Sequence, residues 1–178
     1  MARALVVIDI QNDYFPGGRN ELVGADDAAA RAAEVLAGFR ERGEQVVHLQ
    51  HVWDAPDAEF FAPGTPGVEI NPAVAPAGDE AVVQKAFPNG FQHTDLEQRL
   101  RAGDAEQLVL CGMMTSMCVD ATVRAAADLG FECTVVHDAC ATRDLSFEGR
   151  PVAAADVHAA FLAALGDGYA ALTSASDV

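Results

Sequence analysis

Positive charge is scarce in this chain, and long apolar segments are missing. The 178 residues include 11 lysines and arginines against 27 aspartates and glutamates, so the net charge is −16. A surface that follows nucleic-acid phosphates needs clustered positive charge, which argues against a nucleic-acid partner. No apolar run reaches the roughly 18 residues of a membrane-spanning helix, and no basic leader with a cleavage site precedes the first apolar segment. We therefore expect a cytoplasmic protein without a membrane partner.

Cysteine is also sparse, and its spacing excludes two common uses. The four cysteines lie at positions 111, 118, 133 and 140, without a C-x2-C pair of the kind that binds zinc. A chain of this size does not need disulfides to fold, so we expect free thiols. Cys111, Cys133 and Cys140 are interpreted as small packing residues in or beside apolar runs, whereas Cys118 follows a turn that contains glycine.

What the chain does contain is a hydrophobic fraction of 51%, enough for a substantial core within one domain spanning residues 1–178. Apolar strand-like segments alternate with segments of helical spacing. Strands are expected at 4–10, 45–51, 82–84, 107–111, 132–137 and 169–172, and helices at 26–42, 93–101, 117–129 and 152–165. This alternation predicts an α/β fold, an open three-layer α/β/α sandwich with a mostly parallel, six-stranded, Rossmann-like sheet.

A long irregular segment, 53–79, interrupts the regular pattern and contains five of the eight prolines. Loops longer than about 12–15 residues in compact domains usually line or cover functional sites. Ligands of open parallel sheets bind beyond the carboxyl ends of the strands. We therefore expect the 53–79 loop to border a small-molecule site at that end of the sheet.

Three chemically capable side chains follow predicted strands. Asp9 ends the first, Lys85 the third, and Cys118 lies in the first turn of the helix after the fourth. Taken singly, they are also compatible with a helix cap or ion pair, a solvent-seeking lysine and a packing cysteine. Together they could supply a base, a cation and a nucleophile to one cleft. The helix start is expected to lower the pKa of the Cys118 thiol.

Four segments together resemble a known family. They are VVIDIQNDYF at 6–15, QKAFPNGF at 84–91, LCGMMTSMCVDATVRAAADLGF at 110–131 and VVHDACAT at 135–142. The sequence is similar to the isochorismatase-like cysteine hydrolases, which include nicotinamidase and N-carbamoylsarcosine amidohydrolase. The resemblance spans nearly the whole chain and implies the isochorismatase-like hydrolase fold.

The resemblance also implies a mechanism. Asp9, Lys85 and Cys118 match the family's catalytic triad, and the turn before the cysteine is expected to contain a cis peptide between Met113 and Met114. The amides of Met114 and Cys118 would form the oxyanion hole. The implied activity is cleavage of a C–N bond in a small amide, ureido compound or lactam through a Cys118 thioester. The implied assembly is a homodimer or homotetramer.

No metal and no other cofactor is expected. Nicotinamidases carry metal ligands in an Asp-x-His segment after the second strand, where this chain reads His51, Val52 and Trp53. His48 and His51 are therefore interpreted as strand residues. Nicotinamide is accordingly disfavoured as a substrate. Isochorismate is disfavoured because true isochorismatases cleave a vinyl ether without a cysteine nucleophile, whereas this chain has Cys118 in place.

Aromatic residues around the predicted cleft suggest a small, flat or partly apolar substrate. Those expected to contact it are Tyr14, Phe15, Trp53, Phe60 and Phe91. For Phe60 and its neighbour Phe61, packing at a subunit interface is an equal alternative.

Two other classes of function remain to be weighed. One is a catalytically silent α/β scaffold or binding protein of the same fold, against which the intact Asp9, Lys85 and Cys118 argue. The other is a mononucleotide or flavin-binding domain, which needs a glycine-rich phosphate turn after the first strand. The sequence IDIQNDYFPGG at that point lacks G-x-G-x-x-G, so this alternative is the weakest.

Overall fold

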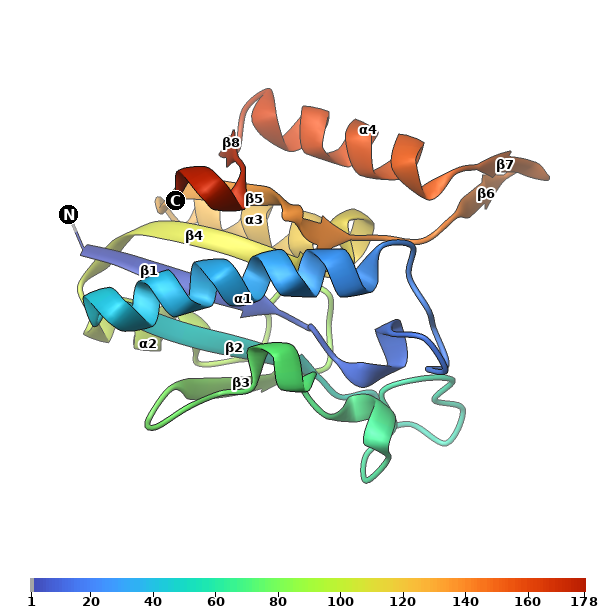
Figure 1. Cartoon of the computed structure of the whole chain (residues 1–178), viewed down its shortest axis with the longest axis horizontal. Helices are drawn as coiled ribbons and strands as arrows, with labels where there is room; N and C mark the ends of the chain where they lie inside the picture. The colour runs from blue at the N-terminus through green and yellow to red at the C-terminus, as the bar shows by residue number, and fades with distance from the viewer. Residues whose placement is uncertain (1) are drawn as a thin grey trace.

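A computed structural model describes residues 2–178, and its centre is one six-stranded sheet (Figure 1). The strands are β1 (Ala2–Ile8), β2 (Gln45–His51), β3 (Ala81–Lys85), β4 (Ala105–Met113), β5 (Glu132–Ala141) and β8 (Ala171–Thr173). Their order is β3-β2-β1-β4-β5-β8, and every neighbouring pair is parallel. The predicted α/β architecture with six strands is confirmed.

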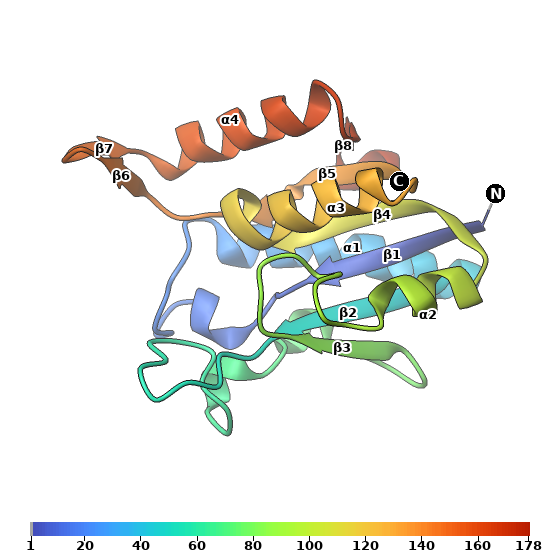
Figure 2. The same ribbon diagram turned by 180° about the vertical axis from the view of Figure 1, so that it is seen from behind.

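Helices cover both faces of the sheet. Helix α1 (Ala25–Arg42) lies on one face, and α2 (Leu96–Ala102) and α3 (Asp120–Asp128) lie on the other, as Figure 1 and the reverse view in Figure 2 show. Helix α4 (Ala154–Gly166) contributes Leu162 and Leu165 to the core of this second face. None of the helices in residues 2–178 is both long and apolar enough to cross a bilayer.

The alternating strand residues explain why two separate cores form. Leu5 and Val7 of β1 point to the α1 face, whereas Val6 and Ile8 point to the opposite face, and all four are buried. A strand with apolar residues on both faces suits the middle of a parallel sheet. The central position of β1 therefore follows from its unbroken apolar run.

The strand order creates a switch point between β1 and β4. From β1 the chain adds β2 and then β3 on one side, and it later returns to place β4, β5 and β8 on the other side. Connections that leave in opposite directions open a crevice at the carboxyl ends of the two central strands. Residues that directly follow β1 and β4 are therefore brought to the same place.

Some elements differ from the sequence prediction. The helix expected from His93 begins at Leu96, since His93 adopts a left-handed φ of 56° that a helix excludes. The helix expected over 117–129 is one π-helical turn, Thr115–Val119, followed by α3. A short hairpin of β6 (Leu145–Phe147) and β7 (Arg150–Val152) was not predicted; it precedes α4 and projects from the body of the protein in Figure 1.

The 53–79 loop is held against the segment that follows β1. The Gln11 side chain donates to the carbonyls of His51 and Val68 at 2.9 and 2.7 Å. The Asp13 carboxylate accepts the Phe61 amide at 2.6 Å. These hydrogen bonds fasten the loop beyond the carboxyl ends of β1 and β2, where a bound molecule would be enclosed.

A carboxylate network outside this region gives the fold a defined acid sensitivity. Glu80 accepts from Arg40 at 2.7 Å, from the His48 ring at 2.9 Å and from the Ala77 amide at 2.9 Å. The Arg40 hydrogen bond, helped by those of Ala77 and His48, lowers the pKa of Glu80 to about 2. A lowered carboxyl pKa stabilises the fold above the unfolded value of about 4.3, and this stabilisation is lost as the pH falls toward 2.

We expect Glu80→Gln to reduce the free energy of unfolding by about 1–2 kcal/mol at pH 7, a figure discounted because Arg40 is partly solvent-exposed. The difference from the wild type should shrink as the pH approaches 2. Urea denaturation at pH 7, 4 and 2.5 measures it. A difference that is constant over this range would show that the ionised form of Glu80 has no special role in stability.

Candidate active site

Four neighbouring strand ends bring together Lys85, His51, Asp9 and Cys118. Lys85 and His51 are the last residues of β3 and β2, Asp9 directly follows β1, and Cys118 lies in the turn after β4. Lys85 Nζ is 2.6 Å from Asp9 Oδ2 and 3.3 Å from Cys118 Sγ. The structure thus places the three predicted residues Asp9, Lys85 and Cys118 in one buried cluster.

The backbone around Asp9 departs from regular strand geometry. Asp9 has a φ of 49°, while its amide still donates to the Leu49 carbonyl at 3.1 Å. A left-handed conformation is unfavourable for most non-glycine residues, and aspartate tolerates it better than others. Gly112 of β4 packs so closely on Ile8 that a Cβ would collide with the Ile8 carbonyl. This close approach of β1 and β4 sets the spacing between Asp9 and the turn that carries Cys118.

Lys85 is held as an ammonium group at the centre of the cluster. Besides Asp9 and Cys118, its Nζ contacts His51 Nδ1 at 3.0 Å and donates to the Phe87 carbonyl at 3.1 Å. Burial lowers the pKa of Lys85, but the charge of Asp9 and the contact with Cys118 outweigh burial, so the pKa lies above its usual value. Lys85 is therefore positively charged at neutral pH.

His51 contributes a neutral ring. Burial, together with the charge of Lys85, lowers the pKa of His51 to about 4. The unprotonated Nδ1 can then accept a hydrogen bond from Lys85, which leaves the ring proton on Nε2. His51 thereby accepts a hydrogen bond from the ammonium group and, being neutral, does not repel its positive charge.

For Cys118 the structure corrects the expected pKa shift. The thiol is only 4% exposed, and burial together with the charge of Asp9 outweighs Lys85, so its pKa is raised rather than lowered. The helix-start argument was wrong because Cys118 is enclosed in the π-helical turn and shielded from water. The resting group is a thiol, and a base would have to remove its proton before the sulfur could act as a nucleophile. Asp9 Oδ1, which has no hydrogen-bond partner in the described part of the chain, lies in the same cluster.

The turn that carries Cys118 is braced from two sides. The Met113–Met114 peptide bond is cis, and the Met114 carbonyl accepts from the amides of Met117 and Val119 at 3.0 and 3.1 Å. The Thr115 hydroxyl contacts the His158 ring at 2.9 Å. Ser116 and Thr142 join their hydroxyls at 2.8 Å. These contacts fix the backbone around Cys118 to α4 and to the residue that follows β5.

A cavity of about 510 Å³ adjoins the cluster. His51 lines it and connects it to the buried cluster, since ligand atoms of His51, Asp9 and Cys118 all lie within 4.8 Å of one another. Trp53 and Phe60, both predicted to contact substrate, also line the wall. Their rings pack edge to face with centroids 5.3 Å apart and form an apolar surface.

The structure does not bring the other predicted substrate contacts to this wall. Tyr14 and Phe15 are buried in the core on the α1 face, where the Tyr14 ring packs against Phe61 with centroids 4.7 Å apart. Phe91 stacks on Phe131 with centroids 6.1 Å apart, in the core on the opposite face. None of these three aromatic residues lines the cavity. Burial raises the pKa of the Tyr14 phenol, and Tyr14 lies close enough to Cys118 and Asp9 for their charges to raise it further.

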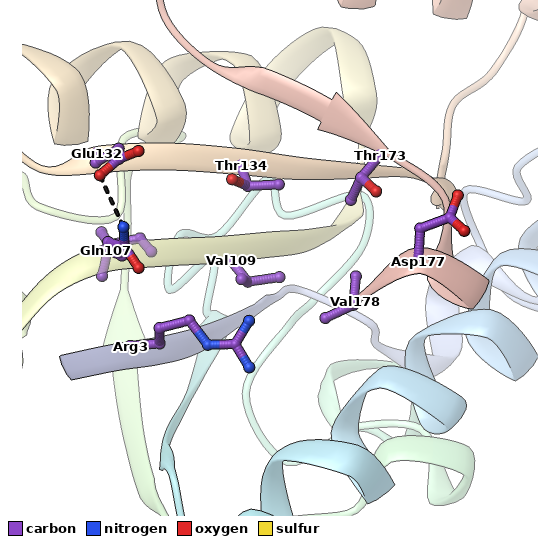
Figure 3. A pocket seen from close by; sticks show the side chains of 9 residues that line it. Arg3, Gln107, Val109, Glu132, Thr134, Thr173, Asp177 and Val178 are labelled. Carbon is purple, nitrogen blue, oxygen red and sulfur yellow. Dashed lines mark hydrogen bonds between the residues drawn. The ribbon is translucent and has the colours of Figure 1, made fainter. Parts of the chain in front are cut away.

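A second hollow lies far from this chemistry. It has a volume of about 220 Å³ and lies near the amino ends of β4 and β5, where Gln107 donates to Glu132 at 2.8 Å (Figure 3). The Arg3 side chain that borders it is paired with Glu44 at 3.1 Å. The strands run from this hollow toward Asp9 and Cys118, so it is at the wrong end of the sheet for the predicted site.

Metal binding at the cluster is opposed by its own geometry. Asp9, His51 and Cys118 are metal-ligating residue types, and their ligand atoms lie close together. The ammonium group of Lys85 already contacts all three, at 2.6, 3.0 and 3.3 Å respectively. A divalent cation would have to displace this buried charge, so these residues do not fit a metal site.

Sequence reasoning missed His51, Gln11 and Asp13 as parts of the site region. His51 could have been found, because the rule that singled out Asp9 and Lys85 applies equally to the last residue of the second strand. Gln11 and Asp13 form hydrogen bonds with the 53–79 loop, and no local sequence pattern predicts such distant contacts.

Comparison with known proteins agrees with this geometry. The isochorismatase domain matches residues 3–177. The chain belongs to the isochorismatase family. It is 49% identical to the uncharacterized isochorismatase family protein YddQ of Bacillus subtilis (strain 168) over 170 residues, covering 96% of this chain and 94% of that one. The crystal structure of a putative isochorismatase hydrolase from Oleispira antarctica superimposes with a TM-score of 0.96 at 50% identity, covering 99% and 95% of the two chains.

Other isochorismatase-family relatives have named activities. The streptothricin hydrolase of Streptomyces noursei is 38% identical over 143 residues, which cover 80% of this chain but only 51% of that protein. The ureidoacrylate amidohydrolase RutB of Azorhizobium caulinodans is 29% identical over 169 residues, covering 76% of this chain and 74% of that one. An N-carbamoylsarcosine amidase structure from Thermoplasma acidophilum has a TM-score of 0.85 at 25% identity, covering 100% and 99% of the chains. The protein is thus an isochorismatase-family hydrolase.

Proposed function

We propose that this hydrolase cleaves a C–N bond in a small amide, ureido compound or lactam, without a metal, through a thioester on Cys118. The observation that carries the proposal is the buried cluster in which Lys85 Nζ lies 2.6 Å from Asp9 and 3.3 Å from Cys118 beside a cavity. A nucleophile, a base and a fixed positive charge are the groups that acyl transfer requires.

In the first half of the proposed reaction, Asp9 takes the thiol proton as Cys118 Sγ attacks the substrate carbonyl. The amides of Met114 and Cys118 would hold the oxygen of the tetrahedral intermediate, an interaction typically worth about 100–1,000-fold in rate per donor. When the intermediate collapses, the C–N bond breaks, and Asp9 returns its proton to the departing nitrogen. Ammonia or an amine leaves, and a thioester remains.

The second half consumes one water. Asp9 removes a proton from the water as its oxygen attacks the thioester carbonyl, and the S–C bond then breaks. The product acid leaves, and the proton on Asp9 returns to the sulfur of Cys118. Throughout both halves Lys85 remains charged, and it stabilises Asp9 and the thiolate whenever either is negative.

The named relatives support this choice of bond. A ureidoacrylate amidohydrolase and an N-carbamoylsarcosine amidase are amide hydrolases by name, and both align with most of this chain. The raised pKa of the Cys118 thiol supports the direct participation of Asp9, because a group that is un-ionised at rest needs a base within reach.

Release of ammonia or amine from a panel of small amides tests the proposal. The panel contains nicotinamide, carbamoyl amino acids, maleamate, ureido compounds and lactams, each assayed with and without a chelator. We expect at least one compound to be hydrolysed at the same rate in the presence of the chelator. Activity that disappears on chelation and returns with a divalent metal would refute the metal-free mechanism. If no compound of the panel is hydrolysed and Cys118 does not react with a thiol alkylator, the result would favour a scaffold without catalytic activity.

A further inference from the structure

The few basic residues of this acidic protein are distributed unevenly. Of the 11 lysines and arginines, eight form ion pairs with carboxylates. Within residues 2–178, the three that form none are Arg19, Arg143 and Arg150. Arg19 and Arg143 both line the cavity beside Cys118, and Arg150 lies on β7 of the projecting hairpin. Two arginines without carboxylate partners therefore line the same cavity in a chain with 27 acidic residues.

Both arginines are attached to backbone that is fixed to the catalytic region. Arg143 directly follows Thr142, whose hydroxyl is 2.8 Å from that of Ser116 in the turn of Cys118. The Arg19 amide donates to the buried Asp13 carboxylate at 3.2 Å. A guanidinium nitrogen of Arg143 contacts the Asn20 side chain at 3.3 Å, next to Arg19 in the chain. The two arginines thus line the cavity from separate segments, which meet where Arg143 contacts Asn20.

The charges around the cavity favour an anion. Its wall includes two arginines and one acid, Glu59, while His51 is neutral at pH 7 because its pKa is about 4. Glu59 is not within ion-pair distance of either arginine among the described contacts. With a net charge of −16 the protein as a whole repels anions. A local pair of positive charges at a cleft reverses this effect where a ligand enters.

We propose that the cavity selects amides that also carry a carboxylate, which Arg19 and Arg143 bind while the scissile carbonyl lies at Cys118. Guanidinium groups match carboxylates through paired N–H···O hydrogen bonds, which gives them an advantage over lysine in this role. Trp53 and Phe60 would flank the part of the substrate between its two ends. This inference rests on the proposed amide hydrolysis for its substrate class, but the carboxylate site itself can be measured without turnover.

Alkylation of Cys118 by iodoacetate and iodoacetamide provides that measurement. Iodoacetate carries a carboxylate where iodoacetamide carries a neutral amide. In both reactions Sγ of Cys118 forms a bond to the CH₂ carbon of the reagent, iodide leaves, and the thiol proton is released. Mass spectrometry of the Cys118 peptide gives each rate, which is divided by the rate with free cysteine. We expect the Arg19→Gln/Arg143→Gln variant to lower the normalised iodoacetate rate about tenfold and to leave the iodoacetamide rate within about twofold. Salt should weaken the wild-type preference for iodoacetate.

Arg150→Gln is the matched control, since it removes an exposed, unpaired arginine that does not line the cavity. It should leave both alkylation rates unchanged. An iodoacetate preference that is equal in the wild type and the Arg19/Arg143 variant would overturn the carboxylate site. If the Arg150→Gln variant lost as much of its iodoacetate rate, the preference would be explained by the net charge of the protein. That result would also overturn the carboxylate site.

Steady-state kinetics separate this inference from the proposed function. A ureido acid and its methyl ester are compared by ammonia release, and we expect the double variant to raise KM for the acid about 10–30-fold while the ester is unaffected. If both compounds are hydrolysed with no effect of the arginines, the carboxylate site is wrong and the hydrolase proposal stands. If no amide is hydrolysed but the iodoacetate preference is lost in the variant, the hydrolase proposal is wrong and the anion site stands.

Discussion

Replacement of Cys118 by alanine is expected to abolish hydrolysis while leaving the protein folded. In the proposed mechanism the sulfur carries the acyl group of the covalent intermediate, so kcat should fall by at least about 10⁴-fold. Cys118 is buried and small, and loss of one sulfur atom should lower the free energy of unfolding by only about 1 kcal/mol. Ammonia release and urea denaturation of the same preparation measure both effects.

Cys133→Ala is the matched control for this experiment. Cys133 is also a free cysteine, 4% exposed like Cys118, and it packs in the same core, but its sulfur donates to the Phe131 carbonyl rather than contacting Lys85. Its replacement should cost similar stability and leave kcat within about twofold. Retention of substantial activity by the Cys118 variant would remove the thioester from the mechanism.

Lys85→Met is expected to produce the largest loss of stability. Asp9 and Lys85 have fully buried side chains 2.6 Å apart, and removal of the ammonium group leaves the carboxylate buried without its partner. Breaking a buried ion pair in this way costs about 3–5 kcal/mol. Because the pKa of Lys85 is raised in the folded protein, its stabilisation is fully present below the unfolded value of about 10.4 and is lost as the pH rises through the folded value. The deficit of the variant should therefore be constant near neutral pH and shrink only in strong alkali.

A double-mutant cycle distinguishes the ion pair from simple packing. Asp9→Asn in the Lys85→Met background removes the unpaired charge, so the double variant should recover at least about 2 kcal/mol relative to Lys85→Met alone. All variants in the cycle should be inactive. Additive losses in the cycle would mean that Lys85 stabilises the fold through its aliphatic chain and that the charge of Asp9 plays no part.

Much of the architecture was accessible from the sequence because it depends on local periodicity. The apolar run of β1 and the strand–helix alternation were enough to predict a parallel sheet, and the carboxyl-end rule then selected Asp9 and Lys85. The hairpin β6–β7 was missed because its strands are only three residues each. Both turn residues, Glu148 and Gly149, have a positive φ. A glutamate at the first of these positions does not predict that conformation, which favours Asn, Asp or Gly.

The environment of the site residues was less accessible, since it depends on tertiary packing. Helical position suggested an acidic thiol at Cys118, but burial, which the sequence does not display, determines the opposite shift. Likewise, Lys85 reaches Asp9 across the end of β2, so the pair spans two strand spacings and links residues 76 positions apart. The arginines of the cavity come from loops whose meeting point is set by the strand order.

The position of Lys85 has a further consequence for how the catalytic unit is maintained. A bound metal is exchanged with the surroundings, and its occupancy depends on supply and on competing ions. Here the cation is covalently part of the chain, so the cluster is assembled as soon as β3 joins β2 and β1 and the turn after β4 packs against them. Under the proposed metal-free mechanism, starvation for metals leaves such a centre intact, and its assembly depends on folding.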